Sequence, residues 1–355
     1  MVTRTVWAWV RVLGGAAIIG LLIWKLGTGA FLDGLRVIDG GTLLVAFGIG
    51  VTTTVFSAWR WCLVARGIGM RLPMRAAIAD YYKALFLNAA LPGGVLGDVD
   101  RAVRHGKDTG DVGRGVRAVV LERTAGQIVL FVVGLTVLVT VPSPVLDVLA
   151  RHGAAAAATT LAILAAGAIV VLGTRRLRSG TSRIAKGART GLAEIRTGLL
   201  SRRNWPGVLL ASSVVLAGHL ATFVVAARAA GSTASVLRLA PLMLLALLAM
   251  TLPLNVGGWG PREGVTAWAF AAAGMSATQG LTIAVVYGVF AFVAALPGAV
   301  VLIARFAARS RTTAPVAVAE PVLEPVAVPQ VGPEVAPAFI PAQRPAPRVL
   351  ATTGA

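Results

Sequence analysis

Two Gly/Pro-rich stretches place charged side chains inside a strongly apolar chain. LPGGVLGDVDR, residues 91–101, and LPLNVGGWGPR, residues 252–262, both begin with Leu-Pro and both end with an arginine. A helix that restarts near Pro261 would turn its partially positive N-terminus toward the second stretch, where Arg262 also lies. A helix N-terminus beside a guanidinium group favours phosphate. The predicted chemistry is therefore the binding of a phosphate-bearing ligand.

The prolines and glycines of the two stretches predict breaks in apolar helices. These residues are Pro92, Gly93, Gly94, Gly97, Pro253, Gly257, Gly258 and Gly260. Asp98 can cap the helix that follows the first break. In hydrocarbon, a broken helix must have its backbone groups satisfied by protein or must line a wet cavity. The alternative is that both breaks are ordinary turns between membrane spans.

Charged and amide side chains near the breaks supply the candidate binding groups. Glu122 and Arg123 lie a few residues inside an apolar run, where each charge costs roughly 2.5–3.5 kcal/mol and suggests function. They could instead reach the membrane interface, and Arg262 could pair with Glu263 or Asp98 rather than hold a ligand. Asn88 can satisfy backbone groups freed by the first break. The candidate substrate-binding residues are Asn88, Asp98, Arg101, Glu122, Arg123, Arg262 and Glu263.

No set of residues predicts catalysis or a resident metal. The chain has no GxSxG, HExxH or P-loop motif, and its one cysteine, Cys62, cannot form an internal disulfide. His105, His152 and His219 are far apart and have no metal-ligand spacing. We expect no cofactor, no metal site and no enzymatic activity.

The elements that must position these residues are membrane helices. The chain is 57% hydrophobic and 13% charged, against roughly 25% charged residues in a soluble domain. Its fold class is predicted to be all-α, a polytopic transmembrane helical bundle with about 7–8 spans and two re-entrant or broken-helix elements. The predicted spans are 8–26, 42–62, 118–141, 154–173, 207–229, 236–255 and 279–304, and the shorter segments are 76–92 and 262–275.

Basic residues indicate the orientation of the chain. The formal net charge is +19, but the arginines and lysines lie in loops and at span ends, so we expect no nucleic-acid partner. Residues 175–203 hold nine Lys or Arg and one acid, which predicts a cytoplasmic loop. Counting spans from that loop places both termini in the cytoplasm. It also gives the two breaks opposite directions, as inverted repeats would have.

The C-terminal segment has a different character. Prolines recur every fourth residue from Pro321 to Pro345, among Val, Ala and Glu. Each proline removes a backbone donor and disfavours helix before it, so no packed core can form. We therefore predict a transmembrane domain over 1–311 and a disordered cytoplasmic tail over 312–355, which acts as a linker rather than as a ligand for a partner domain.

Several motifs together resemble one known family. They are Arg60-Trp61 after the second span, "Y…FLN…LPG…GD…R" up to Arg101, "ER..G" from Glu122, and "P…GG.G.RE" up to Glu263. In order and spacing they are similar to the membrane domain of bacterial lysylphosphatidylglycerol synthases, including stand-alone flippase-like members. The resemblance covers roughly residues 1–310. The matching positions are Asn88, Pro92, Gly97, Asp98, Arg101, Glu122, Arg123, Gly257, Gly258, Gly260, Arg262 and Glu263.

This resemblance implies a helical bundle with re-entrant segments in the bacterial plasma membrane, which moves a phosphate-bearing or anionic lipid between leaflets. Leu96, Glu122 and Pro261 differ from the usual family residues, which bears on the lipid chosen. Aminoacyl transfer is not implied, because only the proline-rich segment follows the bundle. Two alternatives stay open. One is a secondary transporter of a small or lipid-linked substrate, and the other is a membrane anchor for a lipid- or glycan-modifying enzyme.

Overall fold

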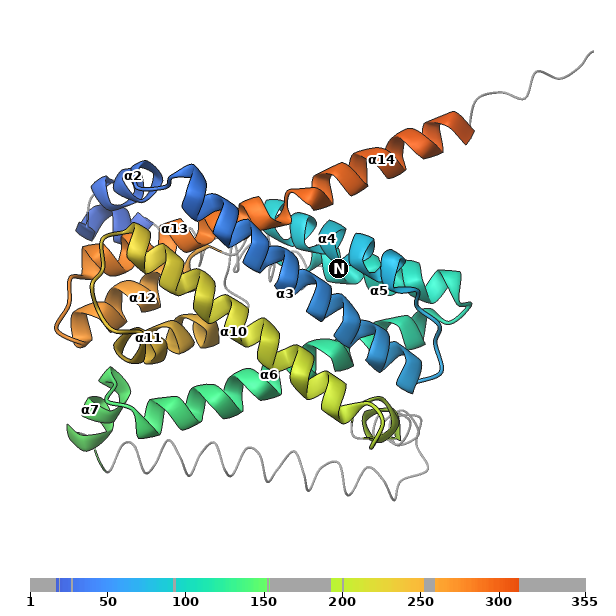
Figure 1. The fold of residues 1–355 in the computed structure, drawn as a ribbon, viewed down its shortest axis with the longest axis horizontal. Coiled ribbons are helices and arrows are strands. Elements are labelled where there is room, and N and C mark those ends of the chain that lie inside the picture. The colour runs from blue at the N-terminus through green and yellow to red at the C-terminus, as the bar shows by residue number, and fades with distance from the viewer. Residues whose placement is uncertain are drawn as a thin grey trace, which may run out of the picture. The chain divides into compact units, whose positions relative to one another are not determined.

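The computed structural model describes residues 17–18, 20–26, 28–91, 94–151, 153, 193–199, 201–251 and 259–312. Its fold class is all-α, as predicted, and the helices of the described part are shown in Figure 1. They are α2 (Gly29–Arg36), α3 (Gly40–Gly67), α4 (Met74–Ala90), α5 (Leu96–Asp108), α6 (Val112–Thr140), α7 (Pro144–Arg151), α10 (Trp205–Ala229), α11 (Val236–Ala249), α12 (Pro261–Ala272), α13 (Ala277–Ala295) and α14 (Pro297–Thr312).

Four helical stretches in the described part are long and apolar enough to cross a membrane. They are Gly40–Gly67, Val112–Thr140, Trp205–Ala229 and Ala277–Ala308, the last of which joins α13 to α14. Four of the predicted spans coincide with these stretches. The span predicted over 236–255 is shorter in the structure, because α11 ends at Ala249. The predicted span 154–173 and most of 8–26 lie outside the described residues.

Polar residues placed immediately before the apolar runs fix where the helices begin. Asp39 caps α3 by accepting hydrogen bonds from Gly41 N (2.7 Å) and Thr42 N (3.0 Å). Asp111 caps α6 in the same way, and Ser235 and Ser276 cap α11 and α13. Each cap satisfies backbone N–H groups that a helix leaves without a partner at its start.

The bundle is held together by close packing of small and aromatic side chains. α3 and α10 lie side by side over most of their lengths (Figure 1). Farther along, Phe223, Leu239, Phe270 and Phe290 bring α10, α11, α12 and α13 into one buried apolar cluster. These contacts are apolar, so they offer no partner to a charged side chain. The buried charges described below must therefore be paired with one another.

Two pairs of short helices form antiparallel hairpins. In the first, Gly97 of α5 lies so close to Ala84 of α4 that a methyl group at position 97 would strike the Ala84 backbone. In the second, Arg238 Nη2 at the start of α11 donates a 2.9 Å hydrogen bond to the carbonyl of Ala273 at the end of α12. At 1.5 Å per residue each of these helices spans at most about 26 Å, less than the roughly 30 Å of a hydrocarbon core.

The open ends of the hairpins lie at opposite ends of α3 (Figure 1). His105 of α5 packs edge-on against Trp61 in the C-terminal half of α3, with ring centroids 5.6 Å apart. Leu239 of α11 instead belongs to the cluster that contains Ala46, in the N-terminal half of α3. This opposite placement is what an inverted repeat predicts. Entry of the hairpins into a membrane without crossing it stays a prediction.

Two of the described break residues have conformations that favour glycine, whereas Gly97 lies in the first turn of α5. Gly94 and Gly260 have φ values of 60° and 118°, a region that other residues rarely adopt. α12 begins at Pro261, as predicted. The prediction that Asp98 caps the next helix is wrong, because α5 already begins at Leu96 and Asp98 lies in its first turn. Its carboxylate instead binds the side chains of Asn88 on α4, Arg123 on α6 and Arg101 on α5 itself.

Several other predictions fall on residues outside the described set. These are the break residues Pro92, Gly93, Pro253, Gly257 and Gly258, most of the basic segment 175–203, and the proline-rich segment from residue 313 onward.

Candidate functional site

Glu122 of α6 is the centre of a buried cluster of charges. Its carboxylate is fully buried and accepts hydrogen bonds from two arginines on other helices. Arg60 Nη2 on α3 lies 2.6 Å from Glu122 Oε1, and Arg101 Nη2 on α5 lies 2.7 Å from Oε2. Tyr81 Oη on α4 adds a longer bond of 3.3 Å to Oε1. One carboxylate therefore joins α3, α4 and α5 to α6.

Aromatic rings and a glycine shape the space around these arginines. The Arg101 guanidinium lies 4.8 Å from the ring centroid of Trp61 and 4.5 Å from that of Tyr81. Such cation–π contacts are favourable where water is excluded. Arg60 fits against α6 because residue 126 is a glycine: a Cβ there would lie 3.0 Å from Arg60 Nη1.

Asp98 connects the cluster to the first break. Its Oδ1 accepts hydrogen bonds of 2.8 Å from both Arg101 Nε and Arg123 Nη2, and its Oδ2 accepts one of 3.1 Å from Asn88 Nδ2. Asn88 Oδ1 in turn accepts a 2.7 Å bond from Gly97 N at the start of α5. Burial would raise the pKa of Asp98, but the charges of Arg123 and Arg101 outweigh it and hold that pKa below its ordinary value.

The cluster carries one positive charge more than its acids neutralise. Arg60, Arg101 and Arg123 face only Asp98 and Glu122 through the ion pairs of the described residues. Arg101 Nη1 and Arg123 Nε are buried, and neither makes a hydrogen bond within the described part of the chain. The Arg123 side chain is 40% exposed, whereas that of Arg101 is fully buried. Arg123 is thus the member that an incoming anion could reach.

A second buried ion pair lies at the start of α12. Arg262 Nε donates to Glu263 Oε1 at 2.9 Å, and Glu263 Oε2 accepts a 2.7 Å bond from Gly260 N. The Arg262 guanidinium lies 5.2 Å from the ring centroids of both Trp259 and Tyr287. Glu263 therefore both neutralises the arginine and satisfies a backbone N–H at the helix start.

A central cavity of about 160 Å³ lies between α3, α4, α6, α10 and α13. Arg60, Tyr81 and Arg123 line it on the side of the first cluster. Tyr287 and His219 line it as well, joined by a 2.9 Å hydrogen bond between Tyr287 Oη and His219 Nδ1. Hydroxyls complete the polar part of the wall, from Thr53, Thr54, Ser57 and Thr222. The volume has room for a phosphate-sized group or several waters.

The structure brings five of the seven predicted binding residues into one cluster. They are Asn88, Asp98, Arg101, Glu122 and Arg123, and their side chains are linked through Asp98 and Glu122. Arg262 and Glu263 form the separate pair of α12, which is the alternative that the sequence left open. Neither Arg101 nor Arg262 lines the central cavity, but each lies on the ring of a tyrosine that does.

Sequence reasoning missed four residues of this region. Arg60 follows an apolar run and reads as an ordinary anchor at the end of a span, and Tyr81 reads as an interfacial aromatic. His219 and Tyr287 stand in apolar helices with no charged neighbour in the sequence. The one signal in the sequence was the Arg60-Trp61 pair, which belongs to the motifs of the family resemblance. In the structure both residues contact the cluster.

Comparison with known proteins identifies a family. The model of a family described as the lysylphosphatidylglycerol synthase TM region matches residues 8–298. No curated protein and no solved structure matches the chain. The matched range contains both hairpins, both ion clusters and the central cavity.

Proposed function

Since the chain belongs to the lysylphosphatidylglycerol synthase TM region family, a multi-pass membrane family linked to lipid handling, we propose that it moves a phosphate-bearing or anionic lipid between leaflets. The protein would act as a flippase-like carrier in the bacterial plasma membrane, with both termini in the cytoplasm, and not as an enzyme. No cofactor is needed for this activity, and its partners are membrane lipids.

The observation that carries the proposal is the uncompensated positive charge beside the central cavity. An uncompensated positive charge inside a membrane protein is costly, so the third arginine of the cluster favours the binding of an anion. Arg123 is partly exposed and lines the cavity, and Arg60 lines it from α3. A lipid phosphate placed between them would accept charge-assisted hydrogen bonds from two guanidinium groups.

The cavity wall suits a polar head group that passes through an apolar bundle. The Ser57 hydroxyl can replace water around the head group as it leaves the interface, whereas the hydroxyls of Thr53, Thr54 and Thr222 donate to backbone carbonyls of their own helices and can only accept hydrogen bonds from it. The wall also contains small apolar residues, Gly50, Ala291 and Ala294. A site of this kind lowers the barrier for the head group while the acyl chains stay in lipid.

A transport assay with a matched pair of arginine variants tests the proposal. Purified protein is reconstituted into vesicles of phosphatidylcholine and phosphatidylglycerol, and movement of fluorescent phosphatidylglycerol is followed by chemical quenching from outside. Arg123→Gln should slow movement at least about tenfold, because one charge-assisted contact to phosphate is worth about 1.5–3 kcal/mol.

The control is Arg114→Gln. Arg114 stands on the same helix, is similarly exposed at 43%, and also pairs with an aspartate, Asp111. Its loss should leave movement unchanged. Equal rates for the wild type and the folded Arg123→Gln protein would contradict the proposed function.

A proton-coupled secondary transporter is the second candidate function. It is favoured by the hydrogen-bonded pair of His219 and Tyr287, which places a titratable ring in the wall of the central cavity. In that case a pH gradient across the vesicle should drive net uptake, and His219→Gln should abolish the dependence on the gradient. Movement that ignores the gradient would favour a passive flippase.

A further inference from the structure

The charged side chains that line the central cavity are arginines throughout the described part of the chain. They are Arg60 and Arg123, and no aspartate or glutamate of the described residues stands beside them in the wall. The acids that pair with them, Glu122 and Asp98, do not line the cavity, and both oxygens of each already accept hydrogen bonds from side chains. An ammonium group in this cavity would therefore meet guanidinium groups and no counter-charge, which makes its burial costly.

One face of α3 supplies the polar wall of the cavity in a fixed order. Gly50, Thr53, Ser57 and Arg60 all line it, and they are spaced three or four positions apart, so they stand on one side of the helix. Thr53 and Arg60 are therefore separated by about two turns, or about 10 Å along the axis. A head group whose phosphate lies at Arg60 can extend along the hydroxyls of Ser57 and Thr53.

The threonine hydroxyls of this wall can only accept hydrogen bonds from a ligand. Thr53 Oγ1 donates to the Gly50 carbonyl at 2.9 Å, and Thr222 Oγ1 donates to the Gly218 carbonyl at 3.0 Å. Each hydroxyl has one proton, which these bonds use, so its lone pairs remain for a ligand. A Cβ at Gly218 would strike the methyl group of Thr53, so both threonines flank the same point of α10. Together they suit a ligand that brings neutral donors, as hydroxyl groups do.

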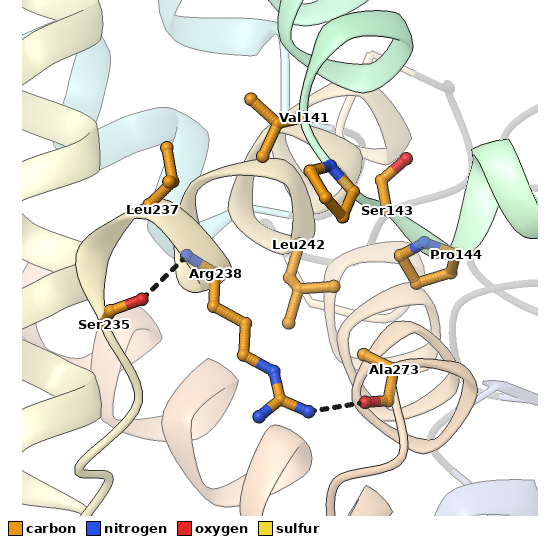
Figure 2. A pocket seen from close by; sticks show the side chains of 9 residues that line it. Val141, Ser143, Pro144, Ser235, Leu237, Arg238, Leu242 and Ala273 are labelled. Atoms are coloured by element: carbon orange, nitrogen blue, oxygen red, sulfur yellow. Dashed lines mark hydrogen bonds between the residues drawn. The ribbon is translucent and has the colours of Figure 1, made fainter.

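A larger cavity, of about 320 Å³, lacks this arrangement (Figure 2). It lies near the ends of α6 and α12 and the start of α11, and its lining is mostly apolar. Ser143 Oγ there donates to the Leu138 carbonyl at 2.9 Å and accepts from Leu146 N at 3.3 Å. Ser235 Oγ accepts from Arg238 N at 3.3 Å, as Figure 2 shows. A row of hydroxyl acceptors that leads away from an arginine therefore distinguishes the central cavity.

We propose that the central cavity selects a phosphate lipid whose head group is a small polyol, of the size of glycerol, without an ammonium group. The proposal deepens the proposed function and rests on it for the lipid nature of the ligand. Arg60 and Arg123 hold the phosphate, while Thr53 and Thr222 accept hydrogen bonds from the hydroxyls of the polyol. The volume of about 160 Å³ equals the share of about five water molecules in the liquid, which limits the group that enters to a small one.

Short-chain lipids that differ only in the head group test this selectivity. Phosphatidylglycerol carries hydroxyl groups, phosphatidylpropanol has the same length and charge without them, and phosphatidyl-3-aminopropanol adds an ammonium group. Each is titrated below its micelle concentration into full-length protein in detergent, and binding is measured by native mass spectrometry. Phosphatidylglycerol should bind at least about fivefold more tightly than phosphatidylpropanol, because it gains hydrogen bonds to the threonine oxygens. The aminopropanol lipid should bind at least about tenfold more weakly than phosphatidylpropanol.

Threonine variants locate the effect in the cavity. The double variant Thr53→Val, Thr222→Val nearly keeps the shape of the wall and removes both acceptors. Its affinity for phosphatidylglycerol should fall to that for phosphatidylpropanol, while phosphatidylpropanol binds as to the wild type, a pattern that loss of folded protein cannot produce. The matched control is Thr52→Val. Thr52 donates to the Gly48 carbonyl at 3.1 Å in the same way but does not line the cavity, so every affinity should stay unchanged.

Equal binding of phosphatidylglycerol and phosphatidylpropanol by the wild type would overturn the proposal. An aminopropanol lipid that binds as tightly as phosphatidylglycerol, or an equal loss of both anionic lipids in the double threonine variant, would do the same. Glycerol phosphate, titrated alone, decides the source of the ligand: the lipid assignment requires that it bind at least about tenfold more weakly than phosphatidylglycerol, and equal affinity would overturn it.

These outcomes are separate from the vesicle assay of Arg123. A protein that moves no lipid in vesicles can still show this order of affinities, and a working flippase can lack it. Failure of the selectivity therefore differs in its readout from failure of the proposed function.

Discussion

Tyr81 and Tyr287 line the same cavity although one stands on α4 and the other on α13. Each ring also supports the arginine that ends one of the two breaks. The Arg101 guanidinium lies 4.5 Å from the Tyr81 centroid, and that of Arg262 lies 5.2 Å from the Tyr287 centroid. Each arginine has a tryptophan and a glutamate as further neighbours. The two halves of the bundle thus hold an arginine in the same way, each against a tyrosine that lines the central cavity.

Removal of the Glu122 carboxylate should destabilise the protein strongly. Glu122→Gln keeps the shape but leaves Arg60 and Arg101 without their shared acid, and breaking a buried pair in this way costs about 3–5 kcal/mol. Thermal unfolding in detergent, followed by fluorescence, measures the loss. Glu194→Gln is the control, because its partner Arg117 is 38% exposed and the effect should stay below about 1 kcal/mol.

Alanine at two helical glycines should have opposite effects. A Cβ at Gly288 would strike Arg262 Nη2 and come within 3.0 Å of the Trp259 ring, so Gly288→Ala should destabilise by about 1–3 kcal/mol. A Cβ at Gly48 of α3 would meet nothing within 4 Å, and Gly48→Ala should stabilise slightly through helix propensity. Melting temperatures of the two variants check the prediction. An unchanged or higher melting temperature of Gly288→Ala would show that Arg262 does not pack tightly against residue 288.

Loss of Arg262 should reduce the folded yield, because Glu263 would then be a buried charge without a partner. The amount of monodisperse protein after size-exclusion chromatography measures this effect. Adding Glu263→Gln should restore much of the yield, since the amide removes the charge while its oxygen can still accept from Gly260 N. Glu263→Ala should rescue less, because it also removes the helix cap. Normal yield for Arg262→Ala alone would show that the ion pair of Arg262 and Glu263 contributes little to the stability of the fold.

Acidification should destabilise the protein through His105. Burial lowers the pKa of this ring, and the charges of Asp108 and Asp80 oppose but do not outweigh it. Trp61 covers it from α3. The unfolded chain, with an ordinary pKa near 6.5, therefore binds a proton before the folded protein does. The stability that the neutral ring contributes is present above about pH 6.5 and is lost as the pH falls toward the folded pKa.

Melting temperatures between pH 8 and pH 5 test this window. The wild type should lose stability below about pH 6.5, whereas the decrease should be smaller in His105→Gln, which cannot take up the proton. Parallel curves for the two proteins would assign the pH dependence to other groups.

The sequence reveals the short-range part of this architecture. The breaks, the start of α12 at Pro261 and the pairing of Arg262 with the adjacent Glu263 follow from residue types within a few positions. Asn88 and Asp98 are only 10 positions apart, across a turn that brings α4 and α5 together. Such contacts follow from local spacing, whereas Glu122 and Arg123 join the cluster across 21 and 25 positions, through the packing of α6 on α5.

The long-range part could not be read from the same pattern. Arg60 reaches Ser212 across 152 positions, and its place in α3 looks like an ordinary basic end of a span. The ring of Tyr287 becomes part of the cavity only through the packing of α13 against α10 and α3. Periodicity and charge indicate that a residue is buried or exposed, but they do not say which distant residue it meets.

The pairing of Arg60 with Glu122 has a consequence for biosynthesis. The two residues are 62 positions apart, and a ribosome adds about 5–20 residues per second. For roughly 3–12 seconds α3 therefore exists with a guanidinium group whose acid has not yet been made. During that interval Arg60 must remain in water, at the interface or within the translocation machinery. Once α6 has been made, Glu122 can pair with Arg60, and the C-terminal part of α3 can then reach its final depth in the membrane. The final placement of α3 therefore follows the insertion of α6.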